Sequence, residues 1–285
     1  MQNSLLFKGR KLVIATMHEK ERVIAPLLEK NLGVEVVVPK DFNSDKFGTF
    51  TREIKRAGNQ LEAARAKAHA AIASVDAELG VASEGSFGAH PSIPFIQSNL
   101  ELLLFVDKRN GYEIRGHHRT SETNIDGRYV TTVREALDFA EKVGFPEHGV
   151  IVRKSESGRF GIHKNIQTED VLKETVTKML GGMFTKRVFI ESDMRAHRNP
   201  TRMKAIKKAT EDLIQNITSL CPKCQAPGFV VVDFEKGLPC ALCRIPTDLP
   251  LNDTYQCNVC SHEENKRVTK YGEASDPQYC GYCNP

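Results

Sequence analysis

The first forty residues contain two short apolar runs separated by an amphipathic stretch. Lys11–Ala15 (KLVIA) and Val34–Val38 (VEVVV) are rich in β-branched residues, which is typical of buried strands. Between them, the apolar residues of Val23–Leu28 recur at helical spacing. This order predicts a strand, a turn, a helix and a second strand within an α/β sheet.

The turn after the first predicted strand carries residues that suit an anionic ligand. Thr16, His18 and Lys20 lie between the end of the strand and the start of the helix. In α/β sheets ligands bind at this edge, and a helix N-terminus favours anions. Thr16 and Lys20 are therefore candidate phosphate ligands, whereas His18 on its own is typical of a solvated loop.

A second helix and strand end at a lone acidic residue. Leu61–Ala73 is rich in alanine, has high helix propensity and carries Glu62 and Lys67. It leads into LGVASEGSFG, which predicts a short apolar strand and then a tight turn over Ser83–Ser86. Glu84 on this turn is either a solvated bend residue or a ligand of a metal ion or water. We favour the ligand, because carboxylates suit Mg²⁺ and Mg²⁺ suits phosphates.

A basic segment follows much later in the chain. Residues 186–208 contain eight Lys or Arg residues against Glu191 and Asp193. Asn199 favours a turn and Pro200 fits the first position of a helix, so a helix should begin here. The residues expected to form an anion site around this helix start are Arg195, His197, Arg198 and Arg202. The lysines further along the helix fit a solvated face.

Other polar residues give weaker signals. The polar, turn-rich segment before the alanine-rich helix contains Glu53 and Arg56. The weaker candidates for a site are His90, Asn124, His163 and Lys164, and His117 and His118 are expected in a loop.

Length and composition indicate one medium α/β domain followed by a small module. The chain has 285 residues and a net charge of only +4, which by itself argues for no particular partner. It contains no run of eighteen apolar residues, so we expect no membrane association. The first fifteen residues lack an apolar secretion signal, and we expect a cytoplasmic protein.

All eight cysteines lie after residue 220, in four C-x-x-C pairs. The pairs are Cys221/Cys224, Cys240/Cys243, Cys257/Cys260 and Cys280/Cys283. Taken in order, they enclose fifteen and nineteen residues, within the range for four-thiolate zinc sites. In a reducing compartment disulfides are disfavoured, and redox activity would need one pair, not four. We predict two structural zinc ions, with either consecutive or interleaved pairing of the C-x-x-C motifs.

The cysteine-rich segment has the composition of a double zinc ribbon that needs metal to fold. It is short of apolar residues, has prolines and glycines at turns, and contains one evident strand, GFVVVDF. From Ser219 on, six basic residues face eight acidic ones, and ligated tetrathiolate sites would add about −2 each. Because nucleic-acid binding depends on Lys and Arg, this acidity favours a structural, docking or oligomerisation role.

Two separated parts of the chain resemble the inosine triphosphate pyrophosphatase family. KLVIATMHEKERVIAPLL, Glu53, LEAARAKA and VASEGSFG resemble its N-terminal half, which has a T-x-N-x-x-K turn, an E-N-A-x-x-K-A helix and an A-D-D-S-G strand end. RAHRNPTRMKAIKKATEDL resembles its S-H-R-G turn and closing helix. In this chain His18 replaces the turn asparagine, the turn is one residue shorter, and Glu84 alone stands for the two acidic residues.

The resemblance implies a mixed, twisted central sheet flanked by helices over residues 1–218, followed by the double zinc ribbon over 219–285. It also implies Mg²⁺-dependent hydrolysis of a nucleoside triphosphate, on non-canonical purine nucleotides, to the monophosphate and pyrophosphate. The implied catalytic residues are Lys20, Glu53, Glu84, Asp193 and Arg195. The implied substrate-binding residues are Thr16, His18, Glu62, Lys67, Ser86, His197, Arg198 and Arg202.

The competing hypothesis is a protein that keeps the fold and senses nucleotides or binds nucleic acid without turnover. The missing asparagine and aspartate favour it, whereas the retained lysines and glutamates favour the enzyme. Under either hypothesis the expected partner is a nucleotide or another phosphate-bearing small molecule. The sequence leaves the oligomeric state open, a homodimer included.

Overall fold

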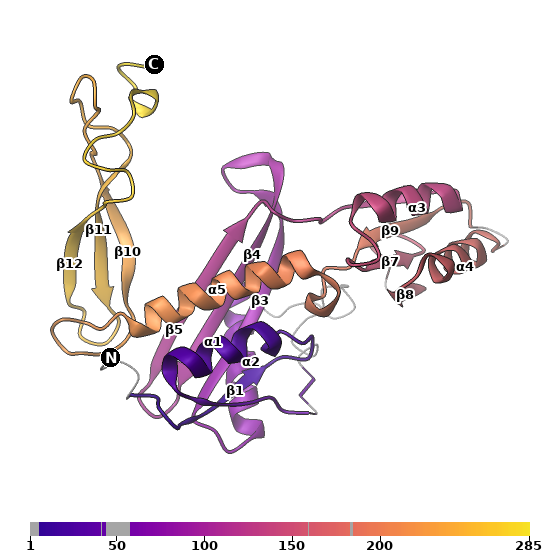
Figure 1. Cartoon of the computed structure of the whole chain (residues 1–285), viewed down its shortest axis with the longest axis horizontal. Coiled ribbons are helices and arrows are strands. Elements are labelled where there is room, and N and C mark those ends of the chain that lie inside the picture. Colours follow the sequence, from indigo (N-terminus) through magenta and orange to yellow (C-terminus); the bar gives the residue numbers. More distant parts are fainter. Residues whose placement is uncertain (1–5, 41, 44–57, 159, 183–184) are drawn as a thin grey trace. The chain divides into compact units, whose positions relative to one another are not determined.

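The computed structural model describes residues 6–40, 42–43, 58–158, 160–182 and 185–285. The chain is a mixed α/β protein that forms two compact units, Met1–Ile214 and Gln215–Pro285 (Figure 1). In the described part of the chain, no helix combines the length and apolarity needed to cross a membrane.

The first unit contains a five-stranded sheet with strand order β2-β1-β3-β4-β5. Its strands are β1 (Lys11–Ala15), β2 (Glu35–Val37), β3 (Leu79–His90), β4 (Ile93–Asp107) and β5 (Tyr112–Thr120). β1 pairs in parallel with β2 and β3, whereas β4 is antiparallel to both β3 and β5. The sheet is therefore mixed, with its parallel part built from the first strand–helix–strand segment.

Helices cover both faces of this sheet. They are α1 (Glu21–Leu32), α2 (Gln60–Ser74) and α5 (Pro200–Thr218). The small side chains of α2 allow it to pack directly on the β1 and β3 residues Val13, Ala15 and Ala82. On the other face the α5 backbone lies so close to β5 that a Cβ at Gly116 would stand 2.3 Å from the Leu213 nitrogen. Glycine at position 116 is thus a requirement of this helix–sheet contact.

A second, four-stranded antiparallel sheet lies between α2 and α5 in the sequence. Its strand order is β6-β9-β7-β8. Its elements are β6 (Gly127–Val130), α3 (Val133–Lys142), β7 (Val150–Arg153), β8 (Ile162–Ile166), α4 (Glu169–Leu180) and β9 (Val188–Ser192). Phe139 of α3 and Leu172 and Val176 of α4 pack against Ile190 and form a core of their own.

The second unit is a three-stranded antiparallel sheet with cysteine hairpins at its ends. Its strands are β10 (Phe229–Lys236), β11 (Pro250–Cys257) and β12 (Glu263–Arg267), in that order. The remaining elements of the chain are two short 3₁₀ turns, η3 (Ala196–Arg198) and η4 (Pro277–Tyr279).

Local patterns predicted several elements well and two poorly. The strand at Lys11–Ala15 and the helix start at Pro200 are confirmed. The tight turn expected over Ser83–Ser86 is wrong, because β3 continues through it and pairs with β4 as far as His90. The loop expected at His117 and His118 is also wrong, since both residues lie in β5.

Candidate functional site

The candidate site lies at the carboxyl end of β1. This strand pairs with β3 only as far as Ala82, so Ser83 and Glu84 lie beyond its end. Successive strand side chains point to opposite faces, and here each is contacted from a different helix: Ser83 by Lys20 before α1, and Glu84 by Lys67 of α2. α1 and α2 thus lie on opposite faces of the sheet at this edge. Open α/β sheets bind ligands at such a position.

A buried ion pair joins α2 to β3 at this position. The Lys67 ammonium lies 2.5 Å from a Glu84 carboxylate oxygen, and both side chains are less than a tenth exposed. The Gln60 side-chain amide donates to the Glu84 carbonyl oxygen at 2.6 Å, which ties the start of α2 to the same strand. Two predicted site residues are therefore direct partners.

Lys20 is buried at the start of α1. Its ammonium donates to the Ser83 hydroxyl at 2.9 Å. Burial, and then the charge of Arg202, lower the pKa of Lys20 from 10.5 to about 7. Thr16 is buried in the same turn, and its hydroxyl accepts a hydrogen bond from the His18 backbone. The Lys20 side chain can therefore take up or release a proton near neutral pH.

Arg202 holds the start of α5 against the sheet. Its guanidinium donates to the fully buried Glu101 carboxylate at 2.8 Å and to the Met194 carbonyl oxygen. It also lies over the Phe87 ring, 5.1 Å from the centroid. A Cβ at Gly85 would stand 2.5 Å from the guanidinium, so the small residue in β3 makes room for this charge rather than for a turn. These contacts position the Arg202 guanidinium, and its role as a substrate ligand stays a prediction.

The turn before α5 lies against the turn before α1. The His197 ring stacks on the His18 ring, with centroids 5.2 Å apart. Burial, and then the neighbouring charges of His18 and Arg195, lower the pKa of His197. Arg195 pairs with buried Asp193 at 2.6 Å and donates to the Asn165 side chain at 3.0 Å. The two parts of the sequence that were predicted to form one site are therefore adjacent at His18 and His197.

Some predicted residues lie elsewhere. Glu62 is exposed and accepts a hydrogen bond from the Asn59 backbone, so it forms a capping box at the start of α2. Ser86 is exposed on β3, and Glu53 lies outside the described residues. Among the weaker candidates, His90 ends β3, Asn124 bonds to Asn199, and His163 and Lys164 lie on β8.

Sequence reasoning missed Ser83, Gln60 and Glu101. Ser83 and Gln60 have small or common polar side chains that no local pattern distinguishes. Glu101 did carry a signal, because it is a lone carboxylate within the apolar run of β4. A charge in such a position requires a buried partner, which here is Arg202.

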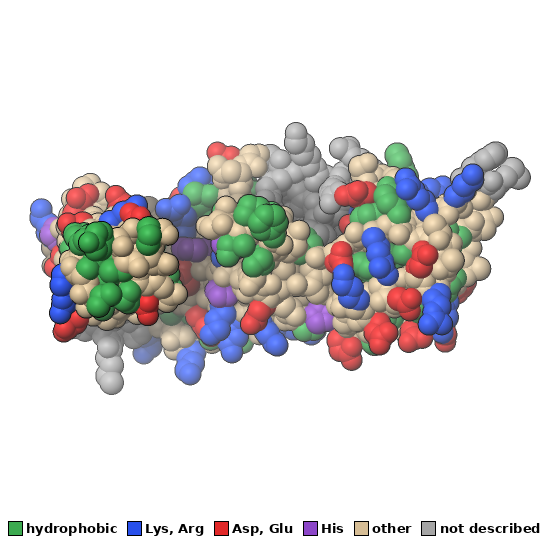
Figure 2. All heavy atoms as spheres, turned by 90° about the horizontal axis from the view of Figure 1, so that it is seen from above, with side chains coloured by type: hydrophobic (Ala, Val, Ile, Leu, Met, Phe, Trp, Pro, Cys, Tyr) green, Lys and Arg blue, Asp and Glu red, His purple; other side chains and the backbone are tan. Residues whose placement is uncertain are grey.

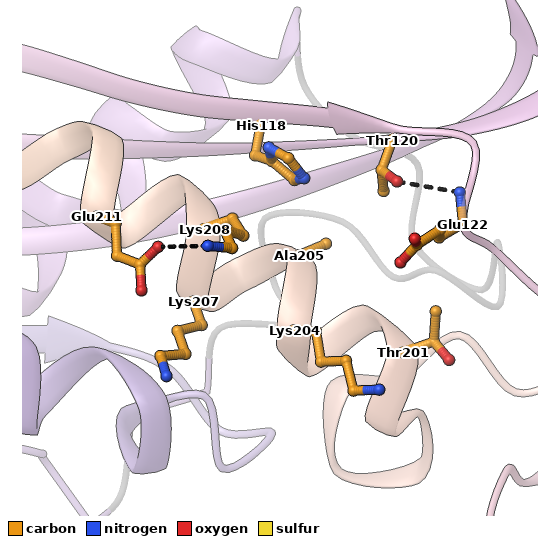
Figure 3. Close-up of a pocket in the computed structure, with 9 residues that line it drawn as sticks. All are labelled: His118, Thr120, Glu122, Thr201, Lys204, Ala205, Lys207, Lys208 and Glu211. Atoms are coloured by element: carbon orange, nitrogen blue, oxygen red, sulfur yellow. Dashed lines mark hydrogen bonds and ion pairs between the residues drawn. The ribbon is translucent and has the colours of Figure 1, made fainter.

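A separate hollow of about 480 Å³ lies between β5 and α5. Its lining residues include His118 and Thr120 of β5 and Lys204, Lys207 and Lys208 of α5 (Figure 3). Lys208 pairs with Glu211 at 3.1 Å, and the Lys204 and Lys207 side chains point away from His118. These lysines do not converge on a common point, which fits the solvated basic face that the sequence predicted.

The cysteines of the second unit form two groups of four. One group is Cys221, Cys224, Cys257 and Cys260, and the other is Cys240, Cys243, Cys280 and Cys283. Within each group the sulfur atoms lie within 4.8 Å of one another, so each can hold a metal ion such as zinc. The pairing is interleaved, because the first C-x-x-C motif joins the third and the second joins the fourth.

Backbone amides favour thiolates in these groups. Leu242 and Val259 each donate their N–H to the sulfur of the preceding motif cysteine, at 3.4 Å. Although burial opposes it, hydrogen bonds from the Cys224 and Lys223 backbones lower the pKa of Cys221 to about 7. Despite a hydrogen bond from the Ala226 backbone, burial and the neighbouring thiols raise the pKa of Cys224 to about 12. The thiolate is the form that binds a metal ion.

Residues 67–285 match the family described as a domain of unknown function (DUF6671), and because this is most of the chain, the protein belongs to that family. The match includes Lys67, Glu84, Glu101, Arg202 and all eight cysteines. No curated protein sequence matches the chain significantly.

Proposed function

We propose that this member of the DUF6671 family binds a nucleoside triphosphate at the carboxyl end of β1 and hydrolyses it to the monophosphate and pyrophosphate. The observation that carries the proposal is a cluster of buried charges drawn from four elements and the turn before α1. Its members are Lys20, Lys67, Arg202, Glu84 and Glu101, each at most 8% exposed. With Lys20 protonated the cluster has one more cation than anions, and a bound phosphate would balance it.

Each residue has a role that its position supports. Lys20 is poised to become charged when an anion binds, because a nearby negative charge favours its protonated form. Lys67 would turn from Glu84 towards phosphate, and the Glu84 carboxylate would then orient or deprotonate the attacking water. His197 and Arg198, on the turn beside His18, would contact the base.

The proposal includes a Mg²⁺ ion bound together with the nucleotide. Glu84 offers a hard carboxylate oxygen, as Mg²⁺ requires, and Glu53 is proposed as a second ligand. When bound, the cation supplies charge withdrawal from the phosphate oxygens. The resemblance of the N-terminal segments to the inosine triphosphate pyrophosphatase family supports the same substrate class, with deaminated purine nucleotides as the first to test.

The test is a pyrophosphate-release screen on the purified full chain, over standard and deaminated nucleoside triphosphates, with and without Mg²⁺. We expect turnover that needs Mg²⁺ and that falls by about two orders of magnitude or more in Glu84→Gln, since this change removes a charge and keeps the shape. Glu78→Gln is the matched control, because Glu78 pairs with Arg10 and Arg109 away from the site. Equal turnover in both variants would contradict the assignment.

A binding protein without turnover is the second candidate. It is favoured by the fact that Glu84 and Glu101 each form an ion pair, with Lys67 and Arg202. Equilibrium dialysis separates the two functions: nucleotide binding without pyrophosphate release from any nucleotide would identify a sensor.

For the second unit we propose two structural zinc ions. The four-thiolate groups and the small apolar content of the unit support this choice. Its formal charge of −2, from six basic and eight acidic residues, gives little support to nucleic-acid binding there.

A further inference from the structure

The hairpin that joins β3 to β4 lacks charged residues. From Gly85 to Leu100 the sequence contains no Asp, Glu, Lys or Arg, although these types make up 27% of the chain. Its turn instead reads Pro-Ser-Ile-Pro-Phe-Ile over residues 91–96. Charged residues normally keep a protein surface soluble, so we expect a surface hairpin without them to have another role.

The end of this hairpin has no neighbouring strand in the described structure. β1 pairs with β3 only up to Ala82, and β5 pairs with β4 only from Asn99 on. Residues 88–98 therefore form a two-stranded ribbon that extends beyond the other strands of the sheet (Figure 1). Both edges of this ribbon therefore lack a neighbouring strand among the described residues, and unpaired edges are open to a partner.

The tip of the ribbon, Pro91–Gln97, is exposed at every residue. Phe95 is 96% exposed, and Ile93 and Ile96 are nearly half exposed. Figure 2 shows a hydrophobic patch over this end of the hairpin. Single exposed apolar residues are ordinary, but three on one projecting turn are typical of an interaction surface.

We propose that the tip Pro91–Gln97 is a self-association surface, through which two copies of this chain pack on each other about a twofold axis. Such an interface places a patch against its own copy, so any charge near the axis meets a like charge. A long uncharged stretch avoids this repulsion. A surface for a different protein has no such restriction, because opposite charges there assist recognition.

The tip is small for a protein–protein interface. Seven residues bury less than the roughly 800 Å² per partner of a standard interface. We therefore expect a weak dimer. It bears on the site because the base of the same ribbon holds Phe87, whose ring lies under the Arg202 guanidinium.

The test is sedimentation equilibrium of the full metal-loaded chain, from low micromolar concentrations upward. The wild type should show a monomer–dimer equilibrium. Phe95→Asp places a charge against its own copy and should raise the dissociation constant by at least about tenfold. Phe95→Ser should weaken the dimer to a smaller extent. Phe160→Asp is the matched control, because Phe160 is 87% exposed at a position outside the hairpin and should leave the dimer unchanged.

Three results would overturn the proposal. They are a wild type that stays monomeric throughout, a dimer that survives both Phe95 variants, and equal weakening by Phe160→Asp. Thermal melts of all variants establish that they are folded. Flotation of the wild type with phosphatidylcholine vesicles adds a further check: vesicle binding by a monomeric protein would identify the tip as membrane-inserting and would equally overturn self-association.

Discussion

Lys20 shows how a single buried charge couples ligand binding to proton uptake. The ammonium lies against the Ser83 hydroxyl and close to two further cations, and its pKa is about 7 rather than 10.5. The unfolded chain keeps this proton up to about pH 10.5, whereas the folded protein releases it near pH 7. The Lys20 contribution to the free energy of unfolding therefore rises with pH between these values. Keeping Lys20 protonated at neutral pH thus costs free energy in the folded protein.

The first prediction concerns anion binding by this residue. Below about pH 7 Lys20 is charged and attracts a bound anion, and above it the attraction is lost. The affinity of the wild type for inorganic pyrophosphate should fall roughly tenfold or more as pH rises through 7, as expected for one charge-assisted contact. In Lys20→Met only the titration of pyrophosphate itself should remain. Calorimetry in buffers of different ionisation enthalpy measures the proton uptake, and equal uptake by both proteins would count against this role.

At the scale of elements, local patterns predicted those helices and strands that are determined by residues close in sequence. The strand at Lys11–Ala15 and the alanine-rich helix follow from periodicity and propensity alone. The course of β3 does not, because Ser83–Ser86 has turn-forming residues and becomes a strand only by pairing with β4. The contact of Lys67 with Glu84 was not derivable from spacing either, although both residues were singled out.

Glu62 gives an element-scale prediction, because its observed role is to cap α2. Glutamine also completes a capping box, so Glu62→Gln should keep both the stability and the pyrophosphate affinity of the wild type. Glu62→Ala should lose about 1 kcal/mol of stability with unchanged affinity. Urea unfolding and calorimetry measure the two quantities. A large loss of Mg²⁺-dependent turnover in Glu62→Gln, at unchanged stability, would instead support the predicted substrate-binding role of this residue.

At the scale of the whole molecule, the interleaved cysteine groups lead us to expect that the second unit folds as a single cooperative structure. The Cys240/Cys243 hairpin lies, in sequence, between the two halves of the first group, and Cys257/Cys260 lies between the two halves of the second. Consecutive pairing would have produced two independent zinc loops. Which pairing forms depends on the register of β10, β11 and β12, which brings distant hairpins together, and spacing alone left it open.

The last prediction follows from this interleaving. Elemental analysis of the reduced wild type should give two zinc ions per chain. Cys221→Ser should lower the content below one, because loss of the first site releases the strands that position the second. Lys223→Ser, an exposed change within the same C-x-x-C motif, should keep both ions. Far-ultraviolet circular dichroism should show that Cys221→Ser retains most of its helices, since α1 to α4 lie wholly in the first unit. One zinc ion bound at full occupancy in Cys221→Ser would mean that the sites load independently, and a wild type without zinc would contradict the metal assignment itself.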